Sequence, residues 1–228
     1  MNITKTLKLM PSPLLKWYAE NRRILPWREE VSPYRTWVSE IMLQQTRVTA
    51  VLPYFQRFMA AYPTVRALAA AEDDRLMRLW QGLGYYSRAR NLKRAAQVIV
   101  ENFGGTFPDT YQDLIALPGI GDYTAGAILS IAMGQEAPAV DGNVLRVVSR
   151  VCAYDGDVTD SKNRKALRDA VESILPVGRA GEFNQAMMDL GATVCLPNGA
   201  PLCDKCPFSS FCRAFATDQV TIFPIKAP

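Results

Sequence analysis

The stretch Leu117-Pro118-Gly119-Ile120-Gly121-Asp122-Tyr123-Thr124-Ala125 joins two segments of helical periodicity through a Gly-x-Gly turn. Glycine at both positions lets backbone N–H groups converge at the start of the second helix, where the helix dipole favours an anion. Gly119 and Gly121 are therefore predicted to contact the phosphate backbone of a nucleic acid, a contact that carries no sequence information by itself. A glycine-rich helical corner without any ligand is the alternative.

Helical periodicity extends over almost the whole chain, and strand-like alternation is nearly absent. Helices are expected over 33–51, from Pro53, and over 64–69, 72–80, 87–102, 110–116, 122–133, 142–153, 162–174 and 182–194. The sequence thus predicts an all-α protein in which the glycine turn is a helix-hairpin-helix motif. The composition changes near 134–138, where one helical lobe is expected to end, and the tail from Val220 is expected to trail off.

Composition limits the possible chemistry. The 228 residues are 49% hydrophobic without a run of eighteen apolar residues, which predicts a soluble globular protein and no membrane span. The N-terminus lacks the apolar region of a signal peptide and is typical of a cytosolic protein. A net charge of +4 mildly favours an anionic partner. Because the chain has no histidine, acid–base work falls to carboxylates, Tyr, Lys or Cys.

Four of the five cysteines lie close together, as Cys195-x7-Cys203-x2-Cys206-x5-Cys212. Four thiolates suit a structural zinc or an iron–sulfur cluster, and the spacing alone does not decide between them. Two disulfides or ordinary buried cysteines are the alternative, although such clustering without a secretory segment is unusual. Cys152 lies outside the cluster and is expected to be a small buried residue.

Two acidic residues occupy positions suited to acid–base chemistry. Glu40 lies inside the first long helix among apolar neighbours, so burial could raise its pKa toward that of a general acid. A glutamate on a solvated helix face is the plainer alternative. Asp141 directly precedes an apolar-periodic helix, where it can act as an N-cap. A functional aspartate there would stay ionised, because the helix N-terminus stabilises its charge, and the two roles can coexist.

Tyr85 and Tyr86 follow Gly82-Leu83-Gly84 and precede a basic helix that starts at Ser87. Exposed aromatic side chains beside cationic charge are typical of base stacking or wedging combined with phosphate contact. A core aromatic pair next to a solvated basic face is the alternative.

Six motifs in order resemble the adenine-specific branch of the endonuclease III superfamily, in particular the A/G-specific adenine DNA glycosylases, from about Leu14 to Cys212. The motifs are Glu40 with MLQQT, GLGYY, LPGIGDYT, VDGNV, FNQAMMDLGATVC and the four clustered cysteines. Family members are two-lobed helix-hairpin-helix proteins with a six-helix barrel lobe and a 4Fe-4S lobe. The resemblance places the barrel at 27–136 and the cluster lobe at 1–26 and 137–228. It implies a 4Fe-4S cluster on Cys195, Cys203, Cys206 and Cys212.

The resemblance also implies base excision repair by a monomeric, cytoplasmic, nucleoid-associated enzyme. Its substrate would be double-stranded DNA with adenine mispaired with 8-oxoguanine or guanine. Glu40 would protonate the flipped adenine as it leaves, and Asp141 would stabilise the oxocarbenium-like sugar or bond to it transiently. Tyr123 and Asn143 match supporting polar residues. Because endonuclease III has a Schiff-base lysine where this chain has Tyr123, a monofunctional glycosylase is expected.

Further residues match substrate-binding positions of the family. Five residues match base-pocket positions: Leu25, Trp27, Arg28, Val48 and Gln185. Three others, Gln45, Leu83 and Tyr85, match residues that the family inserts into the duplex. Thr46 belongs to the MLQQT motif together with Gln45. The family's first cysteine gap is usually six residues, whereas this chain has seven. Typical members continue into a domain that helps recognise 8-oxoguanine. The chain stops at Pro228, so it is expected either to be part of a longer protein or to discriminate the oxidised base weakly.

Other functions stay open at this point. A relative within the superfamily could act on thymine or uracil opposite guanine. A non-catalytic helix-hairpin-helix DNA-binding module would keep the glycine turn and the cysteines, although the presence of both Glu40 and Asp141 argues against it. A bifunctional lyase is a third alternative.

Overall fold

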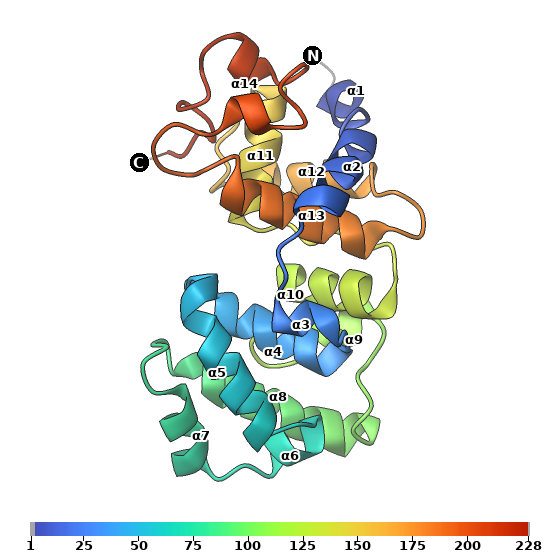
Figure 1. Cartoon of the computed structure of the whole chain (residues 1–228). Coiled ribbons are helices and arrows are strands. Elements are labelled where there is room, and N and C mark those ends of the chain that lie inside the picture. The colour runs from blue at the N-terminus through green and yellow to red at the C-terminus, as the bar shows by residue number, and fades with distance from the viewer. Residues whose placement is uncertain (1–2, 228) are drawn as a thin grey trace. The chain divides into compact units, whose positions relative to one another are not determined.

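A computed structural model describes residues 3–227 of the chain, with side chains from residue 5 onward (Figure 1). Every regular element among these residues is a helix, so the predicted all-α class is confirmed. The chain divides into two compact units. Unit 1 combines Met1–Arg23 with Gly134–Pro228, and unit 2 is the continuous stretch Ile24–Met133. Unit 1 is therefore assembled from both ends of the chain.

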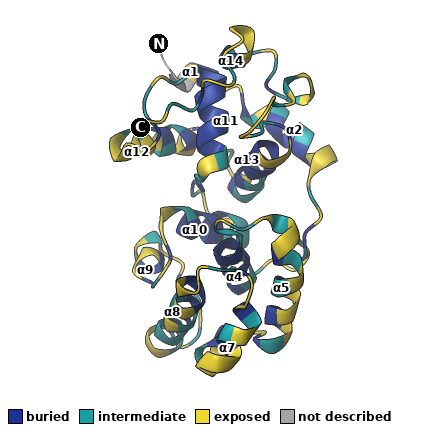
Figure 2. Cartoon of the chain, turned by 90° about the vertical axis from the view of Figure 1, so that its left-hand side faces the viewer, coloured by how far each residue is buried: buried dark blue, intermediate teal, exposed yellow. Residues whose placement is uncertain are grey.

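Unit 2 is built around a core of interlocking aromatic rings. Trp27 packs edge-on against Phe55, Trp37 against Phe107, and Trp80 against Phe58, with ring centroids 5.3, 5.4 and 6.1 Å apart. Its elements are α3 (Pro26–Glu29), α4 (Pro33–Leu43), α5 (Val48–Ala61), α6 (Val65–Ala69), α7 (Asp73–Trp80), α8 (Ser87–Phe103), α9 (Tyr111–Ile115), α10 (Asp122–Ala127) and the π-helical turn η1 (Ile128–Ala132). Most residues of α4 and α10 are buried, as the dark blue of these helices in Figure 2 shows, so both helices lie at the centre of this unit.

Helix α4 begins where the sequence predicts and ends earlier. The Ser32 hydroxyl accepts from the Arg35 N–H at 3.2 Å, and Pro33 occupies the first helical position. The predicted helix over 33–51 is wrong, because Gln45 adopts a left-handed conformation with φ of 55° that interrupts it. A second helix, α5, runs through Pro53, where a new helix was expected to start. A proline there removes one intrahelical donor, and the surrounding core packing retains the helix.

Unit 1 packs its helices around α11 and α13, and Figure 2 shows α11 as buried over most of its length. Its elements are α1 (Ile3–Leu7), α2 (Pro11–Asn21), α11 (Gly142–Cys152), α12 (Ser161–Glu172), α13 (Ala180–Thr193), the 3₁₀ turn η2 (Cys203–Lys205) and α14 (Arg213–Ala216). Helix α2 packs against α13, and α1 packs against α11 and α12, so the N-terminal segment completes a core made mostly by the C-terminal one. The elements α1, α2, α3, η2 and α14 were absent from the sequence expectation.

The C-terminal tail packs onto unit 1, so the prediction that it trails off is wrong. Phe223 is buried in the unit 1 core, and its carbonyl accepts from Arg150 Nε at 3.0 Å. The Ile225 carbonyl accepts from the Val158 N–H at 3.0 Å. A buried apolar side chain and two hydrogen bonds to backbone carbonyls thus hold a segment that has no periodicity to reveal them.

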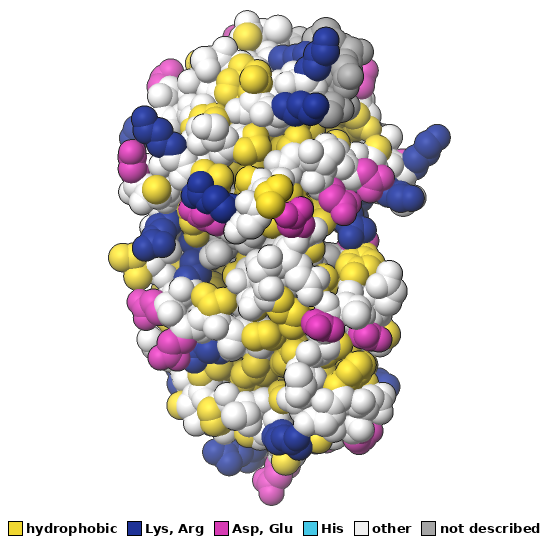
Figure 3. Space-filling model, turned by 90° about the vertical axis from the view of Figure 1, so that its right-hand side faces the viewer, with side chains coloured by type: hydrophobic (Ala, Val, Ile, Leu, Met, Phe, Trp, Pro, Cys, Tyr) yellow, Lys and Arg dark blue, Asp and Glu magenta, His cyan; other side chains and the backbone are white. Residues whose placement is uncertain are grey.

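In the part of the chain that the structure describes, no helix is long and apolar enough to cross a membrane. On the face drawn in Figure 3, basic and acidic side chains are interspersed, which agrees with the small net charge of +4.

Candidate active site

Glu40 is held in the centre of unit 2 by α4. Its side chain is 6% exposed, so the alternative of a solvated-face glutamate is wrong. Tyr123, in the first turn of α10, donates its hydroxyl to Glu40 Oε2 at 2.5 Å. Two residues 83 positions apart in sequence therefore form one polar pair, with the Glu40 member buried.

The glycine turn joins α9 to α10 as a helical hairpin. The Tyr111 hydroxyl on α9 donates to Asp122 Oδ1 on α10 at 2.7 Å and closes the hairpin. Gly119 has φ of +80°, and a Cβ there would meet Asn91 Cβ at 2.9 Å. Gly121 is the N-cap of α10 with an ordinary φ of −105°, and a Cβ there would meet nothing within 4 Å. The first glycine is thus required by the fold, whereas the second leaves open space before the helix N-terminus.

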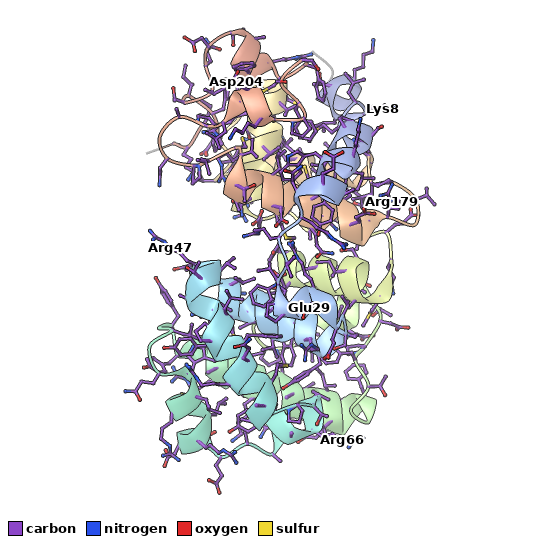
Figure 4. All side chains as sticks on the ribbon, in the orientation of Figure 1. Lys8, Glu29, Arg47, Arg66, Arg179 and Asp204 are labelled. Atoms are coloured by element: carbon purple, nitrogen blue, oxygen red, sulfur yellow. The ribbon has the colours of Figure 1, made fainter. Side chains whose placement is uncertain are left out.

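Two exposed turns of unit 2 carry the residues expected to enter the duplex. Gln45 lies exposed in the turn between α4 and α5, and Figure 4 shows the next basic residue, Arg47, projecting from the start of α5. Tyr85 is 59% exposed and Tyr86 40% exposed before α8, so the alternative of a core aromatic pair is wrong. Leu83 is instead 6% exposed, which leaves its predicted insertion dependent on a movement of its loop.

The expected base-pocket residues of unit 2 differ in burial. Leu25 and Trp27, at the start of α3, are each 5% exposed. Arg28, Thr46 and Val48 are half-buried. Leu25 and Trp27 therefore belong to the packed core, and the half-buried residues lie at its edge.

Asp141 caps α11 in unit 1. Its Oδ1 accepts from the Val144 N–H at 2.8 Å, which confirms the N-cap prediction. Asn143 donates Nδ2 to Asp141 Oδ2 at 2.6 Å and accepts from Arg146 Nη2 at 2.8 Å. Arg146 Nε in turn donates to the Cys195 carbonyl at 2.8 Å. A chain of hydrogen bonds thus fixes the Asp141 carboxyl and links it to the start of the cysteine segment.

Helix α13 supports this arrangement at close range. A Cβ on Gly191 would lie 2.6 Å from Asn143 Cβ, so only glycine lets α13 approach the first turn of α11 so closely. The Gly191 carbonyl also accepts from Arg146 Nη2 at 2.8 Å. Gln185, the pocket residue expected from this helix, is half-buried and accepts from the Tyr18 hydroxyl at 3.4 Å.

The four clustered cysteines, with free thiols, line one small pocket of about 20 Å³ in unit 1. Arg150, which is 4% exposed, donates to Cys195 Sγ at 3.3 Å and to the Leu196 carbonyl at 2.8 Å. Burial first, and the neighbouring thiols to a smaller extent, raise the pKa of the Cys206 thiol to about 12. Burial likewise raises the pKa values of Cys203 and Cys212. A bound metal cation is therefore what would favour the thiolate forms of Cys203, Cys206 and Cys212.

The donor chemistry of this pocket fits an all-thiolate metal group. Within the described chain, no three Cys, Asp or Glu side chains converge closely enough to hold one metal ion. Zn–S bonds of about 2.3 Å would bring the sulfurs of a zinc site within about 4 Å of one another. The four thiols share one pocket, and as a donor set they suit a zinc ion or an iron–sulfur cluster. Assignment to a 4Fe-4S cluster stays a prediction.

Sequence reasoning missed three arginines that organise these regions: Arg88 in unit 2, and Arg146 and Arg150 in unit 1. All three are less than 9% exposed. Arg88 falls in the apolar stripe of α8 that continues through Leu92, Ala95, Ala96 and Ile99. A cation at helical spacing within an apolar stripe is the sequence signal that could have revealed it.

Comparison with known proteins agrees with this geometry. The family model for the HhH-GPD superfamily of base excision DNA repair proteins matches residues 38–173. Curated relatives include the adenine DNA glycosylases of Rattus norvegicus (48% identity over 88% of this chain and 40% of the relative) and Buchnera aphidicola (42% over 93% and 61%). A solved thermostable thymine-DNA glycosylase superposes with a TM-score of 0.83 at 30% identity, over 93% of this chain and 98% of that one.

These matches, together with an all-helical fold that carries a helical hairpin and a buried carboxyl, define the class. The chain belongs to the HhH-GPD superfamily of base excision DNA repair proteins. It spans about half the length of the curated relatives described above.

Proposed function

We propose that this chain carries the catalytic machinery of a monofunctional DNA glycosylase, which hydrolyses the N-glycosidic bond of adenine mispaired with 8-oxoguanine or guanine. The observation that carries the proposal is the buried Glu40 carboxyl, to which the Tyr123 hydroxyl donates at 2.5 Å. A proton donor protected from bulk water is what a departing base requires. The curated relatives of 48% and 42% identity, both named adenine DNA glycosylases, support adenine as the base.

The proposed reaction divides the work between two carboxyl groups. Glu40 protonates the adenine as the bond from nitrogen to the sugar breaks. Asp141, oriented by Asn143 and the Val144 N–H, stabilises the positive charge that develops on the sugar. Water then adds to the anomeric carbon and loses a proton, which leaves free adenine and an abasic site.

The remaining candidate residues bind DNA in this proposal. The hairpin at Gly119 and Gly121 contacts a phosphate. The extrahelical adenine is surrounded by the pocket residues Leu25, Trp27, Arg28, Thr46, Val48 and Gln185. Gln45, Leu83 and Tyr85 fill the space that the adenine leaves in the duplex. The enzyme acts as a monomer on double-stranded DNA in the cytoplasm.

A 4Fe-4S cluster held by Cys195, Cys203, Cys206 and Cys212 would supply a structural centre for the loop between them. Arg150 supports this role, because it already bonds Cys195 Sγ and the Leu196 carbonyl. The bond-breaking groups in the proposal are carboxyls, so the cluster's contribution is to shape the loop for DNA contact.

Excision from a panel of duplexes tests the proposed substrate. Duplexes with adenine opposite 8-oxoguanine, guanine or thymine, and with thymine or uracil opposite guanine, are incubated with excess protein and then treated with alkali. We expect breaks at adenine opposite 8-oxoguanine and guanine, with adenine opposite thymine intact. Breaks at thymine or uracil would instead favour the second candidate function, which the 30% identity to a thymine-DNA glycosylase supports. Binding without any break would identify a non-catalytic DNA-binding module.

Borohydride trapping tests the monofunctional part of the proposal. Tyr123 offers no amine for a Schiff base, so we expect adenine release without a covalent protein–DNA adduct. The Tyr123→Lys variant is the matched positive control. Efficient trapping by the unmodified chain would contradict the monofunctional assignment and leave base removal itself intact.

A further inference from the structure

Arg88 bridges the two exposed turns of unit 2 by hydrogen bonds to backbone carbonyls. On one side its Nη1 donates to the carbonyls of Ile41, Met42 and Gln44 at 2.9, 2.9 and 2.6 Å. On the other side its Nη2 donates to the carbonyls of Leu83 and Gly84 at 3.0 and 3.1 Å. The guanidinium is 7% exposed. One buried cation therefore holds both the end of α4 with its following turn and the loop that precedes α8.

Each of these turns contains a strained residue. Gln45 has φ of 55° and Tyr85 has φ of 47°, and both side chains are exposed. Left-handed backbone is uncommon for residues other than glycine and is a clear outlier for a bulky one such as tyrosine. Such strain persists only where the surroundings over-determine it, and it concentrates at functional sites.

The contacts of Arg88 surround both strained residues. Its Nη2 donates to Thr46 Oγ1 at 3.3 Å, directly after Gln45. Its guanidinium carbon lies 5.6 Å from the centre of the Tyr85 ring and 5.4 Å from that of Trp80. Trp80 also donates its ring N–H to the Gly84 carbonyl at 3.1 Å. The bonds of Arg88 thus fall on the residues immediately before and after Gln45, and on the two residues that precede Tyr85.

We propose that Arg88 is a positioning residue that joins the two turns into one preformed wedge. It holds Gln45 and Tyr85 in their strained conformations before DNA arrives, so that both enter the duplex together when the target base is extruded. This inference rests on the proposed function, because it concerns how the same site opens DNA. A lysine cannot replace Arg88, since a single ammonium lacks the planar fork that reaches carbonyls on two sides.

The Arg88→Lys variant tests this role, with Arg66→Lys as its matched control. Arg66 lies in the same unit and donates to one carbonyl, that of Gly104, far along the sequence from either turn. Single-turnover excision is compared on two duplexes. In the first, called the paired duplex, normal base pairs flank a single mispair on both sides. In the second, called the melted duplex, mismatches on both sides have already unpaired the target adenine. We expect Arg88→Lys to lose about 100-fold on the paired duplex, as misplaced groups do, and to retain most of its rate on the melted one.

A merely structural role predicts a different pattern. If Arg88→Lys loses the same factor on both duplexes, or loses nothing on the paired duplex, the proposal is overturned. Trp80→Phe removes the ring N–H that donates to the Gly84 carbonyl beside Arg88, and it should show a smaller loss confined to the paired duplex. This second variant keeps the test decisive if Arg88→Lys does not fold.

A fluorescence measurement separates this proposal from the proposed function. A 2-aminopurine at the mispair position brightens when it leaves the base stack, whether or not it is excised. We expect the unmodified chain and Arg66→Lys to brighten it, and Arg88→Lys to bind the same duplex without brightening. If the unmodified chain unstacks the base but excises nothing, the proposed function fails and the wedge stands. If Arg88→Lys brightens the probe as fully as the unmodified chain, the wedge fails.

Discussion

The turns of unit 2 and the cysteine segment of unit 1 differ in what holds them. Around Gln45 and Tyr85, hydrogen bonds from the buried side chain of Arg88 to backbone carbonyls hold the two turns. In unit 1, residues 195–212 are all described, and η2 is the only helical element within them. Their four thiols line one shared pocket, and the Arg150 side chain bonds only the first part of the segment, at Cys195 and Leu196. Unit 2 thus holds its turns with its own side chain, whereas the proposed 4Fe-4S cluster would hold the cysteine segment of unit 1.

The largest expected effect is the loss of a thiol from unit 1. Cys206→Ser should lower the melting midpoint by more than about 10 °C, because metal binding contributes directly to folding of such loops. Unit 2 should retain its own transition. Cys152→Ala, a change at the cysteine outside the motif, is the matched control and should keep the metal. Iron content, visible absorbance and circular dichroism melts measure the outcome. A colourless protein with stoichiometric zinc would contradict the 4Fe-4S assignment.

Gly191→Ala tests the close approach of α13 to α11. The new Cβ would lie 2.6 Å from Asn143 Cβ and 3.2 Å from its Cα, so we expect a loss of about 1–3 kcal/mol in the free energy of unfolding. Excision should fall as well, because Asn143 orients Asp141. Gly142→Ala, whose Cβ would meet nothing within 4 Å, controls for adding a methyl group in the same region. If urea denaturation gives the same free energy of unfolding for Gly191→Ala as for the unmodified chain, α13 can move away from α11 without cost, which would contradict the close packing.

Alanine substitutions at the two glycines of the hairpin in unit 2 should differ in their cost to stability, and the smallest effect is expected at Gly121. Gly119→Ala should cost about 1–3 kcal/mol, because it combines a left-handed backbone with a contact at 2.9 Å to Asn91. Gly121→Ala should cost about 1 kcal/mol or less, as an N-cap change does. Duplex binding should nevertheless weaken in Gly121→Ala, since the methyl group occupies the space before the helix N-terminus. Equal duplex affinity of Gly121→Ala and the unmodified chain would count against phosphate binding there.

Helix positions were predictable where periodicity and caps coincide. The expected helix over 87–102 corresponds to α8 (Ser87–Phe103), and that over 142–153 to α11 (Gly142–Cys152). The break at Gln45 was not predictable, because no local propensity of a glutamine signals a left-handed backbone. Both neighbours of Gln45 accept hydrogen bonds from Arg88, which is distant in sequence, and such tertiary contacts are not encoded in the local helical pattern.

Candidate site residues could be named from sequence, but their partners could not. The N-cap role of Asp141 follows from its place before an apolar helix, and the structure confirms it. The pairing of Glu40 with Tyr123 requires α4 and α10 to meet, which neither segment encodes alone. The basic run within α8 predicts phosphate contact, with a solvated face as the alternative, yet Arg88 is buried because it falls on the apolar stripe of that helix. Which cation of a run is buried is decided by helical phase and packing.

Single-turnover excision of adenine opposite 8-oxoguanine by Glu40→Gln tests the central claim most directly. Glutamine keeps the size and burial of the side chain and removes the acidic proton, while Glu101→Gln, on the exposed surface of α8, removes the same charge elsewhere. The account predicts a loss of about 10²–10⁴-fold for Glu40→Gln, the usual contribution of a general acid, and an unchanged rate for Glu101→Gln. Excision by Glu40→Gln at the rate of the unmodified chain would contradict the assignment of Glu40 as the acid that releases the base.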